Sequence, residues 1–379
     1  MILVAKQAIP SFDLTEQYGL IEADVMAAVE RVLKSGHYIL GPEVNAFESE
    51  LAGYLGVRHA IGVANGSDAL LLALMALGIQ PGDEVLIPTF TFFATAGAVA
   101  RLGAVPVFCD IDLNTFNLDP AELEKRLTAK TRAIIPVHLY GQVADMDAIM
   151  NFARQHGLSV IEDAAQAIGA SYRGKTVCNF GDIGCLSFYP TKNLGACGDA
   201  GMVVTNDDPL AEKLRILRTH GSKKKYHHDV LGFNSRLDEL QAAILRVKLK
   251  HLDDWMAKRQ AIAAYYDQAL SDSCFGGKVI APQVAAGNRH VYHQYTIRAE
   301  QRDALIAALA ANGIGSTVYY PLCLHLQPVF AHLGRQPGDC PQAEKATETT
   351  LSLPMHPELA LASQRRVIET IRAFVQDQH

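Results

Sequence analysis

The most restrictive feature of the chain is an alternation of short apolar runs with helix-like segments that begins at residue 59. The runs cover residues 59–64, 84–87, 104–110, 132–138 and 158–162, and further runs follow at 185–188 and 202–205. Strands that alternate with helices form a mostly parallel sheet with helices on both faces. The sequence therefore predicts an α/β fold.

Helical patterns flank this region on both sides. Residues 13–35 and 44–55 carry apolar side chains at helical spacing, and Gly36 supplies the expected stop. Because these helices precede every predicted strand, we expect them to pack outside the core or on another subunit. After Asn234 the apolar spacing predicts one long helix that runs to about residue 269.

This long helix is expected to connect two domains. We place the boundary near residue 250, so that residues 1–250 form a large α/β domain with the N-terminal helices and residues 251–379 form a smaller C-terminal α+β domain. The second domain is predicted to contain strands at 290–298 and 315–320, a helix between them at 302–312, and a terminal helix at 362–376.

The composition is that of an ordinary soluble globular protein. Of the 379 residues, 49% are hydrophobic and 20% are charged, and the net charge of −6 implies no broad basic face for nucleic acid or anionic lipid. A short basic cluster at 223–225 is open to two interpretations, a solvated loop or a phosphate-handling segment. We therefore expect no nucleic-acid partner.

The cysteines and the N-terminal sequence indicate the cellular compartment in which the protein is expected to work. The seven cysteines are scattered singly without a CxxC pair, which argues for a reducing compartment and against a disulfide framework or a metal site. The chain begins without a charged leader and apolar core, and no apolar run approaches membrane-spanning length. The expectation is a cytoplasmic protein with no metal and no membrane partner.

The stretch 184–206, GCLSFYPTKNLGACGDAGMVVTN, places a single lysine between two buried-strand patterns. A lysine at the end of a buried strand can have its ammonium group desolvated, which lowers its pKa. For Lys192 this favours a nucleophilic amine that can form a Schiff base. A plain structural lysine is the alternative. The choice depends on which residues accompany Lys192 at the other strand ends, because ligands of open α/β sheets bind beyond the carboxyl ends of the strands.

The first of these strand ends is Asn65-Gly66-Ser67. Gly66 and Ser67 at a helix N-terminus offer free backbone N–H groups and the positive end of the helix dipole, which suit a phosphate. The structural alternative is that Ser67 only caps the helix.

The second strand end carries Asp163, and the third carries Ser187 ahead of Lys192. A buried carboxylate needs a partner, and one natural partner is the protonated ring nitrogen of pyridoxal 5′-phosphate (PLP). The alternative is an aspartate that caps the following helix. A phosphate cradle, a carboxylate for the ring nitrogen, a serine donor and a Schiff-base lysine are together the parts that a PLP site needs.

With these residues in place, the sequence resembles the DegT/DnrJ/StrS aminotransferases, PLP-dependent enzymes of fold type I that aminate keto groups on nucleotide-linked sugars. The resemblance covers nearly the whole chain. It rests on SGHYILGPEVNAFE (35–48), NGSDAL (65–70), PTFTFFATA (88–96), HLYGQ (138–142), EDAAQAIGA (162–170), SFYPTKNLGACGDAG (187–201) and GFNSRLDELQAAIL (232–245). The resemblance implies fold type I, with a mostly parallel central sheet and a smaller C-terminal α+β domain.

The resemblance also implies roles for the cofactor-binding residues. Lys192 is expected to form the Schiff base with the cofactor and to shuttle the proton between cofactor and substrate carbons. Asp163 is expected to pair with the pyridine nitrogen, and Gln166 to lie near the ring hydroxyl. The phosphate is expected to be held by Gly66, Ser67 and Ser187.

Two further cofactor contacts follow from the same resemblance. Phe92 matches the aromatic residue that stacks on the ring, although some members have tryptophan there. Asn234 matches a residue that reaches the phosphate from the neighbouring subunit, which implies a homodimer with shared active sites.

The substrate is expected to be a dTDP-linked 3-keto-6-deoxyhexose, because residues 220–255 and 318–330 look most like the branch that acts on such sugars. The donor is expected to be L-glutamate, and the product serves deoxyamino sugar pathways such as O-antigen or polysaccharide biosynthesis. The expected substrate contacts are Tyr189, Arg236, Tyr320 and His325. For His325 a packed or surface histidine is an equally open alternative, and enzymes that aminate 4-keto sugars share most of the motifs.

Other activities remain as alternatives. In the related PLP-dependent sugar dehydratases a histidine replaces the lysine, so Lys192 disfavours that reaction. A non-catalytic PLP-binding regulator is a second alternative. A Rossmann-type dehydrogenase is a third, but no GxGxxG follows the first predicted strand.

Overall fold

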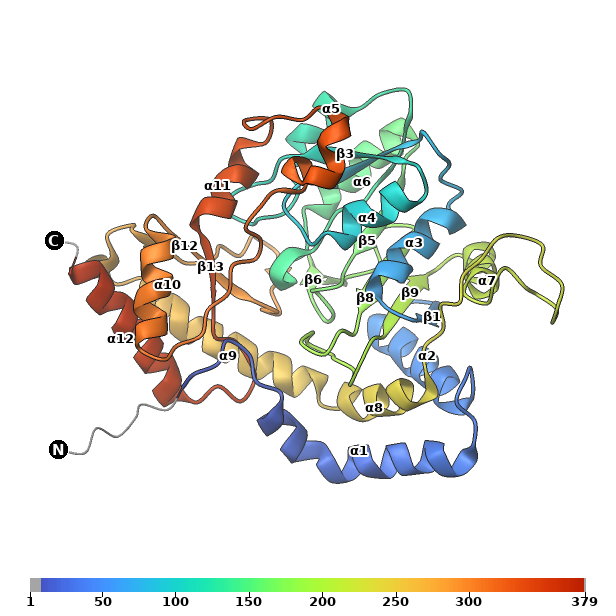
Figure 1. Cartoon of the computed structure of the whole chain (residues 1–379), viewed down its shortest axis with the longest axis horizontal. Coiled ribbons are helices and arrows are strands. Elements are labelled where there is room, and N and C mark those ends of the chain that lie inside the picture. The colour runs from blue at the N-terminus through green and yellow to red at the C-terminus, as the bar shows by residue number, and fades with distance from the viewer. Residues whose placement is uncertain (1–7, 378–379) are drawn as a thin grey trace.

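A seven-stranded sheet forms the centre of the protein in the computed structural model, which describes residues 8–377 (Figure 1). The strand order is β1-β9-β8-β5-β4-β2-β3. Strand β9 runs antiparallel to β1 and β8, and the other neighbours pair in parallel, which agrees with the predicted mostly parallel sheet. The bounds are β1 His59–Val63, β2 Glu84–Pro88, β3 Val105–Cys109, β4 Thr131–Ile134, β5 Ser159–Asp163, β8 Ile183–Ser187 and β9 Gly201–Thr205.

Helices cover both faces of this sheet, because each face carries its own buried apolar cluster. One cluster joins the sheet to α2 (Pro42–Leu55), α5 (Ala121–Arg126), α6 (Met146–His156) and α8 (Glu239–Leu249). The other joins it to α3 (Gly66–Ala76), α4 (Ala94–Arg101) and α7 (Asp208–Leu217). Local capping fixes where these helices begin: side-chain oxygens of Asn65, Asp145 and Asp207 accept N–H bonds at the starts of α3, α6 and α7.

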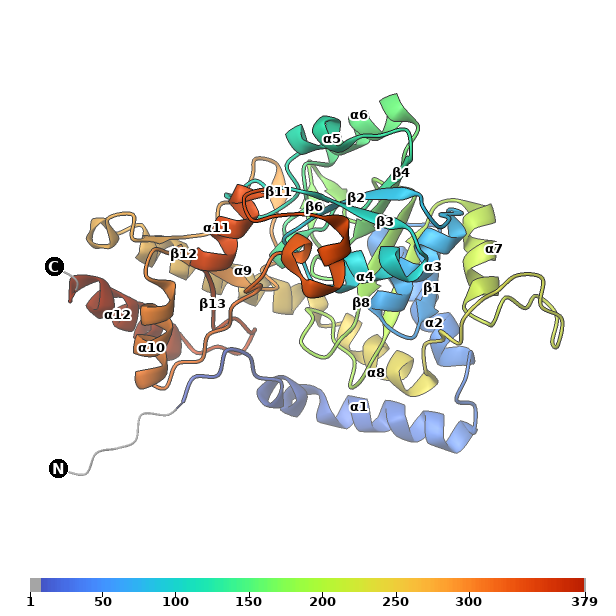
Figure 2. The same ribbon diagram turned by 45° about the horizontal axis from the view of Figure 1, so that its top comes forward.

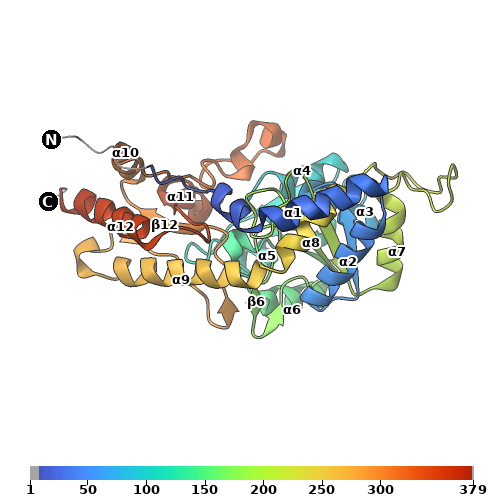
Figure 3. The same cartoon turned by 90° about the horizontal axis from the view of Figure 1, so that it is seen from below.

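Helix α1 (Thr15–Ser35) lies outside this core and against α8, as the view from below shows (Figure 3). Its buried side chains, Ile21, Val25, Ala28 and Val32, pack on Ala243, Ile244 and Val247. The helix ends at Gly36, which has a left-handed φ of 68° and supplies the stop that the sequence predicts.

The prediction of a single long helix after Asn234 is wrong, because the structure has two helices there. Helix α8 ends at Leu249, and a separate helix α9 (Leu252–Leu270) begins after a break at residues 250–251. Leu249 and Leu252 keep helical spacing across the break, so the apolar pattern cannot reveal it. The predicted domain boundary falls at this junction.

The C-terminal part has a small antiparallel sheet of its own, on the side of the molecule opposite α7 (Figures 1 and 2). Its strands are β10 (Val279–Ile280), β12 (Tyr295–Ala299) and β13 (Thr350–Leu353), with α10 (Arg302–Ala311) and α12 (Leu361–Gln376) packed on it. Other short elements are β6 (Ser171–Tyr172), β7 (Lys175–Thr176), β11 (Asn288–Arg289) and the 3₁₀ turns η1 (Leu139–Gly141) and η2 (Ser273–Phe275).

Two predicted strands in this part need correction. Residues 290–294 lie outside a strand, and residues 315–320 form only one isolated bridge, Thr317 to Ser352. Strand β12 pairs with β10 on one side and with β13 on the other, and β13 was not predicted. In the large sheet, the run 132–138 is a strand only as far as Ile134.

Some segments cross the predicted boundary at residue 250, and the division into domains stays a prediction. Ile9 packs in the C-terminal core. Conversely, η3 (Leu324–Leu326) and η4 (Pro328–Leu333) return to the large sheet, where Leu324 and Phe330 join the cluster of α3 and α4. Helix α11 (Pro341–Thr349) follows them along the chain.

The described residues also bear on metals, disulfides and membranes. All seven cysteines are free. Within residues 8–377, no group of three His, Cys, Asp or Glu side chains could hold a metal ion. No helix in this same range combines the length and the apolar character that a membrane crossing requires.

Candidate active site

Three of the predicted strand ends meet at the carboxyl edge of the large sheet. Strand β5 ends at Asp163, which pairs with Cys185 of β8, and β8 ends at Ser187. The start of α3 lies directly beside Ser187: a Cβ added to Gly66 would come 2.6 Å from the Ser187 Cβ. The residues predicted to hold the phosphate are therefore adjacent in space, and Gly66 has no room for a side chain.

The capping alternative for Ser67 is wrong. Asn65 caps α3, since its Oδ1 accepts a 2.8 Å hydrogen bond from the Asp68 N–H. The hydroxyl of Ser67 has no hydrogen-bond partner in the part of the chain that the structure describes. Ser67 therefore stands in the first turn of α3 with a free hydroxyl, where the helix dipole favours an anion.

Asp163 is 5% exposed and has no cationic side chain in ion-pair contact within the described residues. Its Oδ2 accepts a 2.8 Å hydrogen bond from Thr95 Oγ1, and its Oδ1 accepts a 3.2 Å bond from the Ala165 N–H. Burial raises the pKa of Asp163, while these hydrogen bonds and the charge of Lys192 lower it. Turns rather than a helix follow Asp163, so the helix-cap alternative is wrong.

Lys192 lies on the loop between β8 and β9 and is half-buried. The backbone N–H of Lys192 donates to the Tyr189 carbonyl at 2.8 Å, and the side-chain Nδ2 of the neighbouring Asn193 donates to the Val291 carbonyl at 3.0 Å. Burial lowers the pKa of Lys192 to about 8, and the charge of Asp163 opposes this shift. The amine is therefore largely deprotonated at mildly alkaline pH, as a nucleophile or base requires.

Gln166 links two other segments of the site. Its Oε1 accepts a 2.7 Å hydrogen bond from the Tyr140 N–H, and its Nε2 donates to the Tyr320 hydroxyl at 3.1 Å. The ring of Tyr320 lies 6.2 Å from that of Phe92, centroid to centroid, at a tilted angle. Phe92 itself is 56% exposed. The structure thus brings Phe92, Gln166 and Tyr320 together.

The sequence interpretation missed Glu162, which explains why HLYGQ and EDAAQ occur together. Its fully buried carboxylate accepts N–H bonds of 2.7–2.8 Å from Cys178, Phe180 and Gly181, and His138 Nε2 lies 3.1 Å away. The backbone N–H of His138 donates to the Asp163 carbonyl at 3.0 Å. Glu162 and His138 therefore fix the backbone that carries Asp163. An acidic residue inside a buried strand was the available signal.

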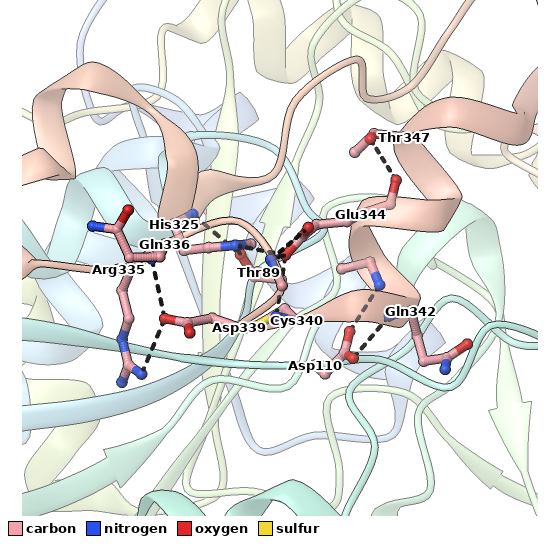
Figure 4. Close-up of polar contacts among 12 residues, drawn as sticks. Thr89, Asp110, His325, Arg335, Gln336, Asp339, Cys340, Gln342, Glu344 and Thr347 are labelled. Carbon is pink, nitrogen blue, oxygen red and sulfur yellow. Dashed lines mark hydrogen bonds and ion pairs between the residues drawn. The ribbon is translucent and has the colours of Figure 1, made fainter.

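His325 lies in a separate hydrogen-bonded cluster (Figure 4). It is 1% exposed; its Nδ1 accepts from Thr89 Oγ1 at 2.7 Å, and its Nε2 donates to Glu344 Oε1 at 3.2 Å. Burial lowers the pKa of His325. Both ring nitrogens are thus engaged within the protein, which favours the packed alternative over a substrate contact.

The remaining predicted residues lie near the surface. Tyr189 is 54% exposed, Asn234 is exposed and Arg236 is half-buried. Asn234 makes one backbone bridge, to Thr219, and its proposed contact across a dimer stays a prediction.

These residues fit PLP on three observations. Gly66, Ser67 and Ser187 lie together at the N-terminus of α3, and the Ser67 hydroxyl has no partner within residues 8–377, which suits a phosphate. Asp163 is a buried carboxylate without an ion-pair partner, which suits a cationic ring nitrogen. Lys192 offers an amine of lowered pKa on which the charge of that carboxylate acts.

Comparison with known proteins agrees with this geometry. The DegT/DnrJ/EryC1/StrS aminotransferase family matches residues 20–372. The chain is 56% identical over 366 residues to a pleiotropic regulatory protein of Geobacillus stearothermophilus, covering 97% of this chain and 98% of the relative. It is 50% identical over 365 residues to a UDP-N-acetyl-3-dehydro-alpha-D-glucosamine 3-aminotransferase of Acidithiobacillus ferrooxidans, covering 96% and 97%. Names of further relatives refer to UDP-, dTDP- and GDP-linked sugars.

Solved structures confirm the fold class and the cofactor. The structure of DesV from S. venezuelae superposes with a TM-score of 0.93 at 46% identity, covering 97% of this chain and 99% of that one. NtdA from Bacillus subtilis, with bound pyridoxamine phosphate (PMP), superposes with a TM-score of 0.88 at 36% identity, covering 94% and 82%. The fold is therefore that of the PLP-dependent aminotransferases, and the dehydrogenase alternative is wrong. The chain belongs to the DegT/DnrJ/EryC1/StrS aminotransferase family and is a PLP-dependent aminotransferase of nucleotide-linked sugars.

Proposed function

We propose that the enzyme moves an amino group from L-glutamate to a dTDP-linked 3-keto-6-deoxyhexose and so forms a dTDP-3-amino-3,6-dideoxyhexose. The observation that carries the transaminase chemistry is the combination of Lys192, with its pKa lowered to about 8, and the buried carboxylate of Asp163, whose charge acts on Lys192. Support for position 3 comes from relatives whose names specify 3-amino or 3-oxo sugars.

Lys192 is the proposed catalytic residue. Bound PLP supplies an electron sink for the carbon that loses its proton. The Lys192 amine would hold the aldehyde of bound PLP and, once the donor's amino group has displaced it, would move the proton between the substrate carbon and the cofactor carbon in each half of the reaction. Because burial brings the pKa of Lys192 near the working pH, the amine can both accept and donate a proton. Such acid–base assistance is worth roughly 10²–10⁴-fold in rate.

The remaining residues bind and orient the cofactor in this proposal. Asp163 stabilises positive charge on the ring nitrogen, and Phe92 covers one face of the ring. The phosphate is held at the N-terminus of α3 by Gly66, Ser67 and Ser187. A Cβ on Gly66 would clash with Ser187. Lys192 also disfavours the dehydratase alternative, in which a histidine takes its place.

The active site is proposed to be shared between two copies of the chain. The segment between α7 and α8 projects from the body (Figure 1) and carries Val230, Leu231 and Phe233 with exposures of 46%, 89% and 42%. Exposed apolar side chains of this kind indicate an interface, and a second copy would cover them. Asn234, next to them, would then reach the partner's phosphate site.

Subunit complementation tests the shared site. Lys192→Ala and Asn234→Ala chains are each expected to lack activity. If Asn234 acts across the interface, a mixed dimer has one site with both residues intact, and activity returns on mixing. Absence of recovery in a mixture that forms mixed dimers, as seen by native mass spectrometry, would contradict the shared site.

The covalent role of Lys192 has a direct test. Borohydride reduction of the PLP-loaded protein followed by peptide mass spectrometry is expected to find the cofactor on Lys192. Glutamate added before reduction is expected to remove the tag, because the donor converts the cofactor to its amine form. A tag on another lysine would refute the assignment.

A comparison of keto-sugars decides the substrate. dTDP-3-keto and dTDP-4-keto-6-deoxyhexoses, each with glutamate, are assayed beside a UDP-linked 3-keto hexose, the second candidate that the 50% identical relative favours. We expect amination at C3 with the dTDP sugar preferred. Amination only at C4 would overturn the position, and preference for the UDP sugar would overturn the nucleotide. No turnover with any of them would overturn all three substrate candidates.

A further inference from the structure

We propose that Thr95 is a positioning residue that holds Asp163 ionised and oriented toward the ring nitrogen of the cofactor. This inference rests on the proposed role of Asp163 and adds a residue that does not itself touch the cofactor.

The contact between Thr95 and Asp163 is direct and dry. Thr95 is fully buried, and its Oγ1 lies 2.8 Å from Asp163 Oδ2. An ionised carboxylate can only accept, so the threonine hydroxyl donates. Asp163 Oδ1 takes the Ala165 N–H at 3.2 Å. With one donor on each oxygen, the carboxylate is fixed in rotation and keeps lone pairs free for a ring N–H.

Thr91 completes the orientation of the hydroxyl. Its Oγ1 lies 3.4 Å from Thr95 Oγ1 and is also buried. Since the Thr95 proton is committed to Asp163, the Thr91 hydroxyl is the donor in this pair. The hydrogen bonds therefore run in one direction, from Thr91 through Thr95 to the carboxylate.

The backbone couples this contact to the ring-stacking residue. Helix α4 begins at Ala94, and the Thr95 N–H donates to the Phe92 carbonyl at 3.3 Å. One turn of chain thus presents Phe92 toward the site and Thr95 toward Asp163. A shift of this turn would move both.

The electrostatic effect of the hydroxyl opposes that of burial. Burial raises the pKa of Asp163, and the bond from Thr95 is the largest influence that lowers it. Hydrogen bonds to a charged group are stronger than those between neutral groups. Removing the hydroxyl therefore favours a protonated Asp163 and, with it, an unprotonated ring nitrogen.

The test compares Thr95→Val, which keeps the shape and removes the donor, with Thr95→Ser, which keeps the donor. Protein loaded with ¹⁵N-labelled PLP reports ring protonation through the nitrogen chemical shift. Thr95→Val is expected to move this shift toward the unprotonated value and to weaken PLP binding by about tenfold or more. Thr95→Ser is expected to keep the nitrogen shift and the PLP affinity of the unsubstituted protein. Thr205→Val, at a buried hydroxyl that donates to the Asp182 carbonyl, controls for loss of a buried hydrogen bond.

The outcomes separate this inference from the role of Asp163 itself. If Thr95→Val leaves the nitrogen shift as in Thr205→Val, the positioning role is refuted even if kcat falls. Asp163→Asn is measured beside them. If the nitrogen stays protonated in Asp163→Asn, the assignment of Asp163 to the ring nitrogen fails as well.

Discussion

Gly66 has space for a hydrogen atom and for nothing larger at the phosphate side of the site. A Cβ there would lie 2.6 Å from Ser187 Cβ and 3.1 Å from Ser187 Oγ. Gly66→Ala must therefore displace the serine that we propose as a phosphate donor. A displaced Ser187 loses its hydrogen bond to the charged phosphate, worth about 1.5–3 kcal/mol, so we expect PLP affinity to fall by about tenfold or more. Titration of the apo-protein with PLP, followed by absorbance, measures it.

Gly53→Ala supplies the matched control for the glycine substitution. Gly53 lies within α2, and a Cβ there meets no atom within 4 Å. This change is expected to leave PLP affinity intact and to stabilise the helix by about 0.5–1 kcal/mol. Equal PLP affinity in Gly66→Ala and Gly53→Ala would contradict the phosphate cradle.

At the scale of single residues, sequence reasoning locates side chains that lie at or just beyond strand ends. The positions of Asp163, Ser187 and Lys192 could be predicted because carboxyl ends of parallel strands meet at one edge, while their roles stay predictions. Thr95 could not, because its contact with Asp163 joins residues 68 positions apart in the sequence. The partners of His325 are also distant in sequence, so its hydrogen bonds could not be predicted either, and its expected substrate contact stays a prediction.

At the scale of the elements, Asp110 joins the large sheet to helix α11. It follows β3, is 6% exposed, and accepts N–H bonds from Gln342 and Ala343 at 2.9 and 2.8 Å (Figure 4). The residue before α11, Cys340, offers no capping side chain. The cap of this helix therefore comes from another part of the chain.

Asp110→Ala is expected to lower the free energy of unfolding by about 2 kcal/mol, because it leaves two backbone N–H groups at the start of α11, one of them buried, without an acceptor. Urea unfolding followed by circular dichroism measures the loss. Asp207→Ala removes a local, exposed cap from α7 and is expected to cost about 1 kcal/mol or less. A loss at Asp110 no larger than at Asp207 would show that α11 does not depend on this cap.

The elements themselves could be predicted where one pattern decides them. The strands of the large sheet are buried on both faces and read as apolar runs, so each was located. The segment 315–320 was predicted as a strand and β13 was not, because only strand pairing, which the sequence does not reveal, separates the two at the small sheet. The break between α8 and α9 changes backbone hydrogen bonding without changing the apolar spacing.

At the scale of the whole molecule, a buried polar cluster joins three distant segments. His356 is 5% exposed, and neither of its ring nitrogens has a hydrogen-bond partner within residues 8–377. It lies edge-on to Phe12 of the N-terminal segment, 6.4 Å between ring centroids, and near the fully buried Arg259 of α9. Burial and the charge of Arg259 lower the pKa of His356 to about 4. The imidazole is therefore neutral in the folded protein.

This junction predicts a loss of stability in acid. The folded-state pKa of His356 lies below the ordinary value of 6.5, so the unfolded chain binds a proton that the folded chain excludes. Its contribution to stability is present above pH 6.5 and is lost as the pH falls toward 4, by about 1.4 kcal/mol per unit. His290, whose pKa burial lowers to about 3, acts in the same direction. Unfolding in urea at several pH values measures how steeply the free energy of unfolding depends on pH.

His356→Gln removes one of the titrating groups, so the free energy of unfolding of this variant must fall less steeply between pH 6.5 and 4. An unchanged slope would mean that His356 is already protonated in the folded protein and that its place between Phe12 and Arg259 does not exclude the charge.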